Sequence, residues 1–143
     1  MRITSPAFEN NQPLPARYTC DGEGINPPLL FAEAPENTKS FVLIVDDPDA
    51  PAGTWVHWVI FNIPKETREI KENSRIGSEG VNSSGSLGYE APCPPSGTHR
   101  YFFKLYALDT MLSLLEKADK KTVDEAMQGH VIANTELIGL YSK

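Results

Sequence analysis

Two of the three histidines in this chain, His57 and His99, lie in short segments rich in β-forming residues. Each segment follows a proline-rich loop, and three aspartates occur within residues 46–49, just before His57. Imidazole can become cationic near neutral pH, and adjacent carboxylates favour its charged form. Two such histidines could therefore bind phosphate or carboxylate oxygens without any Lys or Arg.

The aspartate loop is constrained by the sequence D-P-D-A-P at residues 47–51. Its two prolines restrict the backbone, so the carboxylates are presented with little freedom. If the two histidine strands are close neighbours, the loops before them form one cleft. We expect Arg100 to point away from this cleft and to pair with an acid in the 47–49 turn. The predicted cleft residues are Asp47, Asp49, His57, Pro95, His99 and Tyr101.

Other interpretations of the same residues exist. A single histidine on a strand is more often a core residue, and it is the pair with matched loops that favours a binding site. A metal site of two histidines and Asp47 is conceivable, but no H-x-H, H-E-x-x-H or C-x-x-C motif is present. A hydrolase would need Cys93 or Ser96 as nucleophile beside a histidine, and the G-x-S-x-G motif is absent. We therefore expect a binding protein rather than an enzyme, without cofactor or metal.

The elements that must position these residues are strands. Apolar and β-branched runs predict strands at residues 40–46, 54–63 and 99–108, and a looser alternation predicts a last strand at 132–141. Residues 112–120 form a short amphipathic turn or helix, and a capping-box pattern predicts a helix from 122 to about 130. Side chains alternate between the two faces of a strand. In the strand at 54–63, one face is therefore predicted to carry Trp55, His57, Val59 and Phe61.

The length of 143 residues predicts a single domain, residues 1–143, and the 12 prolines and 10 glycines favour strands and loops over long helices. The net charge of −6 argues against binding to nucleic acid. No segment approaches the roughly 20 apolar residues of a membrane span, and the amino terminus lacks a secretory pattern. We therefore expect a cytoplasmic protein without membrane insertion. A reducing compartment would leave Cys20 and Cys93 as thiols, although a bridge between them stays open.

Two motif blocks, residues 47–58 and 88–101, together resemble the signature of the phosphatidylethanolamine-binding protein family. Residues 20–29 and 133–139 are similar to its short bacterial and archaeal branch. The resemblance implies a mainly β fold, a Greek-key β-sandwich of two antiparallel sheets with a few short peripheral helices. It also implies a small anion pocket at one end of the sandwich. Asp47, His57, Pro95, His99 and Tyr101 match the pocket residues, and Asp49 and Arg100 match supporting positions.

The family resemblance also implies a function. Members bind phosphate-like or carboxylate-like head groups, and several regulate kinases or inhibit proteases, without a firmly established enzymatic activity. This chain ends directly after its last predicted strand, whereas longer eukaryotic members carry a further helix beside the pocket, so we expect a more open pocket. We expect a small anionic ligand and a protein partner of the kinase or protease class. The sequence leaves open whether the chain forms a homodimer.

Overall fold

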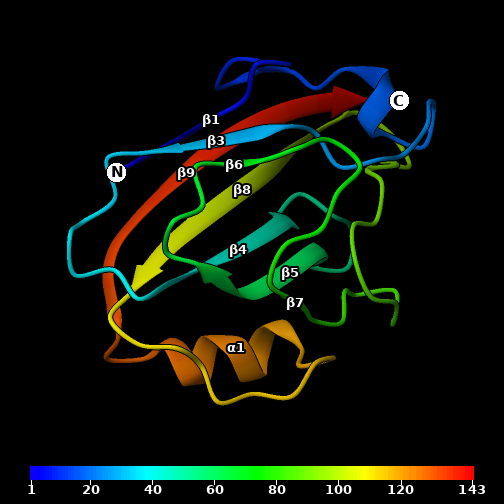
Figure 1. The fold of residues 1–143 in the computed structure, drawn as a ribbon. Coiled ribbons are helices and arrows are strands. Elements are labelled where there is room, and N and C mark those ends of the chain that lie inside the picture. Colours follow the sequence, from blue (N-terminus) through cyan, green and yellow to red (C-terminus); the bar gives the residue numbers. More distant parts are fainter.

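The computed structural model describes residues 1–143 and has three layers: a small sheet, a large sheet, and a helix with loops (Figure 1). The small sheet has the order β1-β3-β6 and the large sheet the order β2-β9-β8-β4-β5-β7. The mainly β prediction with two sheets is confirmed, and the Greek-key connection is compatible with this order. The strands are β1 (Arg2–Thr4), β2 (Gln12–Pro13), β3 (Leu29–Ala32), β4 (Ser40–Asp47), β5 (Trp55–Pro64), β6 (Glu69–Ile70), β7 (Ser78–Glu79), β8 (Thr98–Leu108) and β9 (Val131–Ser142).

One strand pairing departs from the antiparallel expectation. Strand β2 runs parallel to β9, with Gln12 opposite Gly139 and Pro13 opposite Leu140. All other pairs of named strands are antiparallel. The parallel contact is only two residues long, and it fastens the amino-terminal segment to the outer edge of the last strand.

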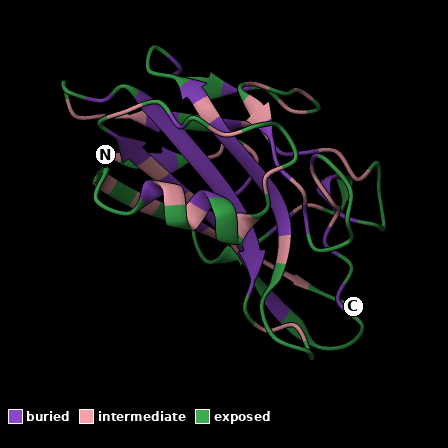
Figure 2. Cartoon of the chain, turned by 90° about the horizontal axis from the view of Figure 1, so that it is seen from below, coloured by how far each residue is buried: buried purple, intermediate pink, exposed green.

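The main core lies between the two sheets. Eighteen buried apolar residues form it, and those of the large sheet alternate along β4 and β8, as in Phe41, Leu43 and Val45. A second core of eight residues lies on the opposite face of the large sheet, under the α-helix. Figure 2 shows the central strands buried along most of their length. The large sheet is therefore covered on both faces, as its continuous apolar strands predict.

Strand β5 contains two extra residues relative to β4, one within residues 61–62 and one at residue 57. Val45 pairs with Trp58, but the next residue of β4, Asp46, pairs with Val56. His57 is consequently left without a partner on β4, which is the geometry of a β-bulge. A bulge interrupts the strict alternation of side chains along a strand, so the period of two does not continue through His57.

Because of the bulge, two residues of β5 do not share the face of His57 as predicted. Val59 and Phe61, expected to share a face with His57, pack instead in the core under the α-helix. Trp58 packs in the core between the sheets. His57 is on this side too, because its ring contacts the ring of Tyr101, which belongs to the same core. Two consecutive residues of β5 therefore face the same side of the sheet.

The only α-helix, α1 (Lys120–Met127), begins earlier and ends earlier than predicted. Asp119 is its N-cap, and its side chain accepts a hydrogen bond from the Thr122 backbone N–H. The capping-box pattern at 122–125 therefore lies inside the helix rather than at its start. A short 3₁₀ helix, η1 (Ala16–Tyr18), precedes β3. No helix of the structure is both long and apolar enough to cross a membrane.

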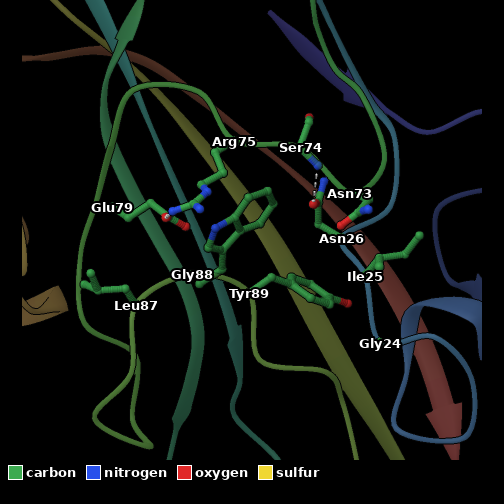
Figure 3. Close-up of a pocket in the computed structure, with 11 residues that line it drawn as sticks. Gly24, Ile25, Asn26, Asn73, Ser74, Arg75, Glu79, Leu87, Gly88 and Tyr89 are labelled. Atoms are coloured by element: carbon green, nitrogen blue, oxygen red, sulfur yellow. Dashed lines mark hydrogen bonds and ion pairs between the residues drawn. The ribbon is translucent and has the colours of Figure 1, made fainter.

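Two cavities lie on either side of the segment 88–91. Gly88 and Tyr89 line a cavity of about 460 Å³ (Figure 3), and Glu90 and Ala91 line a cleft of about 240 Å³. Strand β5 likewise contributes Trp58 to the larger cavity and a different residue, His57, to the cleft. Two consecutive residues of β5 thus line two separate sites.

Candidate functional site

The smaller cleft contains the residues that the sequence singled out. Its walls come from the turn after β4, from the start of β5, from the proline-rich loop at 90–95 and from the start of β8. All five predicted ligand-binding residues line it, namely Asp47, His57, Pro95, His99 and Tyr101.

His99 forms a buried pair with Asp47. Its Nδ1 lies 2.7 Å from Asp47 Oδ2, and the side chains are only 8% and 4% exposed. The other oxygen, Asp47 Oδ1, accepts a hydrogen bond of 2.8 Å from the Asp49 backbone N–H. An ionised carboxylate only accepts hydrogen bonds, so His99 carries its proton on Nδ1 and has Nε2 left for a ligand. We expected Asp47 to contact the ligand, yet each of its oxygens already accepts a hydrogen bond from the protein.

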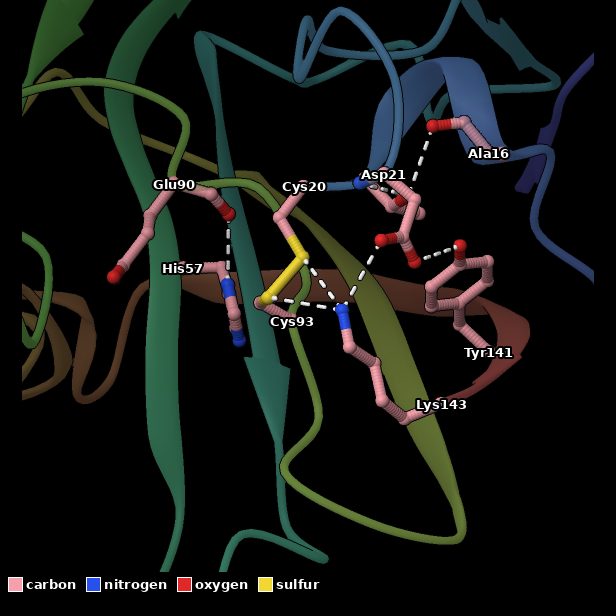
Figure 4. The surroundings of a disulfide bond; sticks show 9 residues. Ala16, Cys20, Asp21, His57, Glu90, Cys93, Tyr141 and Lys143 are labelled. Atoms are coloured by element: carbon pink, nitrogen blue, oxygen red, sulfur yellow. Dashed lines mark hydrogen bonds and ion pairs between the residues drawn. A yellow bond between two sulfur atoms is a disulfide. The ribbon is translucent and has the colours of Figure 1, made fainter.

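His57 is held by the backbone of Glu90. Its Nδ1 donates to the Glu90 carbonyl oxygen at 2.7 Å, and the Glu90 N–H donates to the His57 carbonyl at 2.8 Å. Figure 4 shows the other ring nitrogen pointing away from Glu90. Burial lowers the pKa of His57 below its usual value, although nearby groups including the Asp47 carboxylate oppose the shift. The expectation that neighbouring acids keep both histidines charged is therefore wrong for His57, because desolvation outweighs the acids.

Tyr101 lies between the two imidazoles. Its ring centroid is 5.3 Å from that of His57, in an edge-to-face arrangement, and 6.5 Å from that of His99, nearly parallel to it. Burial, reinforced by the Asp47 carboxylate, raises the pKa of Tyr101, so the hydroxyl keeps its proton. The cleft thus gathers two ring nitrogens and a phenol, which can together accept from and donate to an oxyanion.

The predicted pairing of Arg100 with the acidic turn is confirmed. Arg100 Nε and Nη2 each donate to Asp49 at 2.9 Å, and the Arg100 backbone N–H also donates to it at 2.9 Å. These bonds lower the pKa of Asp49 to about 2. The bidentate pair joins the turn after β4 to the start of β8, so Asp49 and Arg100 support the cleft without lining it.

Cys20 and Cys93 form a disulfide, with their Cα atoms 5.4 Å apart (Figure 4). This corrects the expectation of free thiols: the fold brings together two loops that are 73 residues apart in sequence. Cys93 is itself part of the cleft wall, and Lys143 Nζ lies 3.8 Å from its sulfur. The bridge also removes Cys93 as a nucleophile in this oxidised form.

The sequence did not single out Trp55 and Glu90 as cleft residues, although both line it. Trp55 Nε1 donates to Glu90 Oε2 at 2.8 Å, and this contact closes the outer wall. The Gly88-Tyr89 motif lies next to Glu90, but the role of Glu90 towards His57 is carried by its backbone, which has no sequence signature. No group of three or more His, Cys, Asp or Glu side chains is arranged to hold a metal ion.

Comparison with known proteins gives consistent matches over the whole chain. The family model described as "Phosphatidylethanolamine-binding protein" matches residues 4–142. A UPF0098 protein of Methanothermobacter thermautotrophicus strain Delta H is 53% identical over 100% of this chain and 99% of its own length. A crystal structure from Chlamydia trachomatis D/UW-3/CX, described as a homologue of phosphatidylethanolamine-binding protein, has a TM-score of 0.96 at 45% identity, covering 99% of this chain and 96% of that chain. Escherichia coli YbcL, described as a new member of the mammalian family, has a TM-score of 0.92 at 28% identity, covering 99% and 98%.

Proposed function

The chain belongs to the phosphatidylethanolamine-binding protein family, and we propose that its cleft binds a small anion carrying a phosphate or carboxylate group. The convergence of His57, His99 and Tyr101 around one cavity of about 240 Å³ carries this proposal. A cavity of this size accommodates a head group rather than a large ligand.

The two histidines would have different tasks. His99, held through Nδ1 by the buried Asp47, turns Nε2 towards the anion and donates from this atom when the ring carries both protons. Burial lowers the pKa of His57 and so favours its neutral form, whose Nε2 can accept a hydrogen bond from a hydroxyl of the ligand. A phosphate that carries one proton offers both acceptors and a donor, whereas acetate offers only acceptors. We therefore propose that phosphate groups bind more tightly than simple carboxylates.

A binding role fits these residues better than catalysis. The cysteine that could serve as a nucleophile is bridged to Cys20, and Ser96 makes no hydrogen bond to a histidine. We further propose that the cleft and the residues around it regulate a partner protein of the kinase or protease class. Family membership alone supports that regulatory part.

Thermal unfolding with inorganic phosphate, phosphoethanolamine and acetate tests the anion site. A ligand at 100 times its Kd should stabilise the fold by about 2.7 kcal/mol. His99→Gln should abolish this effect, whereas His130→Gln, on the surface, should retain it. The absence of any stabilisation by all three anions between pH 5 and 8 would refute the proposed site.

A further inference from the structure

The larger cavity, here called the Trp58 cavity, is distinct from the anion cleft. It has a volume of about 460 Å³ and shares no lining residue with the cleft. Trp58 and Tyr89 contribute aromatic surface, with ring centroids 5.5 Å apart in an edge-to-face arrangement. Ile25 and Leu87 add further apolar surface to its lining. These four are the apolar residues among the 11 that line the cavity, so a ligand would meet a small apolar patch within a mostly polar lining.

Trp58 has a buried donor without a partner. The residue is 1% exposed, and its Nε1–H makes no hydrogen bond with the protein. A buried donor left unpaired costs about 1–3 kcal/mol, so a guest that brings an acceptor to it gains that energy. Trp58 Nε1 thus indicates that the cavity suits a ligand with a hydrogen-bond acceptor.

An ion pair forms part of the cavity wall (Figure 3). Arg75 Nη1 lies 2.9 Å from Glu79 Oε1, with the Arg75 side chain 77% exposed and the Glu79 side chain 11% exposed. Glu79 Oε2 accepts no hydrogen bond from the protein. A Cβ on Gly88, which has a φ of +91°, would lie 2.9 Å from this oxygen, so glycine leaves room beside it. Because Trp58 Nε1 is covered, a guest reaches it only when a wall side chain moves, and Arg75, with its side chain 77% exposed, is the charged wall residue that is free to do so.

The opposite wall is rigid. Asn26 donates to two backbone carbonyls, at Pro27 and Lys71, and accepts from the Ser74 N–H at 3.0 Å. In Figure 3, Asn26 and Ser74 lie on the side of Arg75 that is away from Glu79. The charged and polar groups of the cavity that can form hydrogen bonds with a ligand are consequently the Arg75 guanidinium, the Glu79 carboxylate and the Trp58 indole N–H.

We propose that the Trp58 cavity binds a zwitterion with an apolar side chain, that is, a free amino acid or the equivalent end of a small peptide. Its ammonium group pairs with the poorly exposed Glu79, where the aromatic rings also favour a cation. Its carboxylate accepts hydrogen bonds from Arg75 and from Trp58 Nε1. A lone cation leaves the indole N–H unpaired, and a lone anion leaves Glu79 uncompensated, so only the zwitterion satisfies all three groups.

The two tryptophans make the test specific. In Trp55→Phe, Trp58 is the only indole and reports on the cavity directly. We expect L-phenylalanine, which is not excited at 295 nm, to change this fluorescence saturably, with one site by calorimetry. Phenethylamine, which lacks the carboxylate, should bind at least tenfold more weakly, and 3-phenylpropionate, which lacks the ammonium group, more weakly still.

Variants locate the contacts. Glu79→Gln and Arg75→Gln should each weaken L-phenylalanine at least tenfold, and the exposure of Arg75 makes the second variant safe for folding. Glu72→Gln, which alters another Glu–Arg pair, should leave binding unchanged, as should His99→Gln in the separate cleft. No saturable change up to about 10 mM, equal affinity for the three probes, or unaltered binding by Glu79→Gln would each overturn the proposal.

Discussion

His99 Nδ1 lies 2.7 Å from Asp47 Oδ2, and the two side chains are shielded from water. The second oxygen of Asp47 is bonded to the backbone of its own turn, so the carboxylate cannot rotate away from the ring. The pair therefore fixes which nitrogen of His99 faces the ligand. It also supplies a fixed negative charge behind that ring.

Asp47→Asn tests this arrangement. The amide preserves the shape but removes the charge, so we expect phosphate affinity to fall at least tenfold, about 1.4 kcal/mol, while the fold is retained. Calorimetric titration with phosphate measures the change. The control is Asp109→Asn, which alters a His–Asp pair of 2.8 Å with His130 on the surface. Equal loss in both variants would contradict a specific role for Asp47.

Phosphate affinity should increase as the pH falls from 8 to 5.5. The pKa of His57 is lowered from 6.5 by burial, with the carboxylates of Glu90, Asp47 and Asp46 acting against the shift. Burial disfavours the charged ring, so His57 remains an acceptor, and phosphate monoesters gain near pH 6 the proton that this acceptor binds. Titration with phosphoethanolamine at several pH values measures the trend. His57→Gln should flatten it, and an unchanged slope in that variant would disprove the assignment.

Without ligand, the lowered pKa of His57 should make the folded protein less stable as the pH falls, whereas phosphate affinity should increase. The unfolded chain binds a proton at His57 near pH 6.5, whereas the folded protein binds it only at lower pH. The contribution of His57 to the free energy of unfolding is therefore fully present above pH 6.5. It is lost as the pH falls through the pKa of His57 in the folded protein. Urea unfolding at pH 7.5 and 5.5, with His57→Gln as control, should show a smaller loss of stability in the variant.

Reduction of the Cys20–Cys93 bridge should destabilise the fold. Closing a 73-residue loop contributes about 4 kcal/mol in the chain-entropy description of disulfides. Both cysteines are exposed, so dithiothreitol can reach the bridge. Because Cys93 also lines the cleft, phosphate should bind more weakly to the reduced protein. Urea unfolding and phosphate titration test both effects.

The double variant Cys20→Ser with Cys93→Ser is the control for this prediction. It should be as unstable as the reduced protein and should not respond further to dithiothreitol. If the oxidised and reduced proteins had equal stability and equal affinity, the bridge would have no role in either property.

Arg100→Gln should lower the free energy of unfolding at pH 7 by a small but measurable amount, because it removes a bidentate pair at a partly exposed site. The pKa of Asp49, now about 2, should return towards 3.8. The stabilisation is present above pH 3.8 and is lost as the pH falls to about 2, so the difference between variant and parent should shrink in this range. Arg2→Gln, at a pair of 3.4 Å with both side chains exposed, should cost much less.

The sequence alone determined much of this protein. Continuous apolar runs predicted strands at 40–46, 54–63 and 99–108, and the structure has them as β4, β5 and β8 with boundaries shifted by one residue. Such runs are reliable because their burial on both faces is a property of the local residues. The two motif blocks also identified five of the 12 residues that line the cleft, including both histidines.

Only the tertiary structure decided the rest. The bulge of β5 at residue 57 appears solely in its register against β4, and it places His57 and Trp58 on the same side. The pairing of Cys20 with Cys93 depends on two loops meeting across 73 residues. The neutral state of His57 depends on how deeply the fold buries it. Register, long-range contact and desolvation arise from the packing of distant segments, so no local pattern in the sequence could specify them.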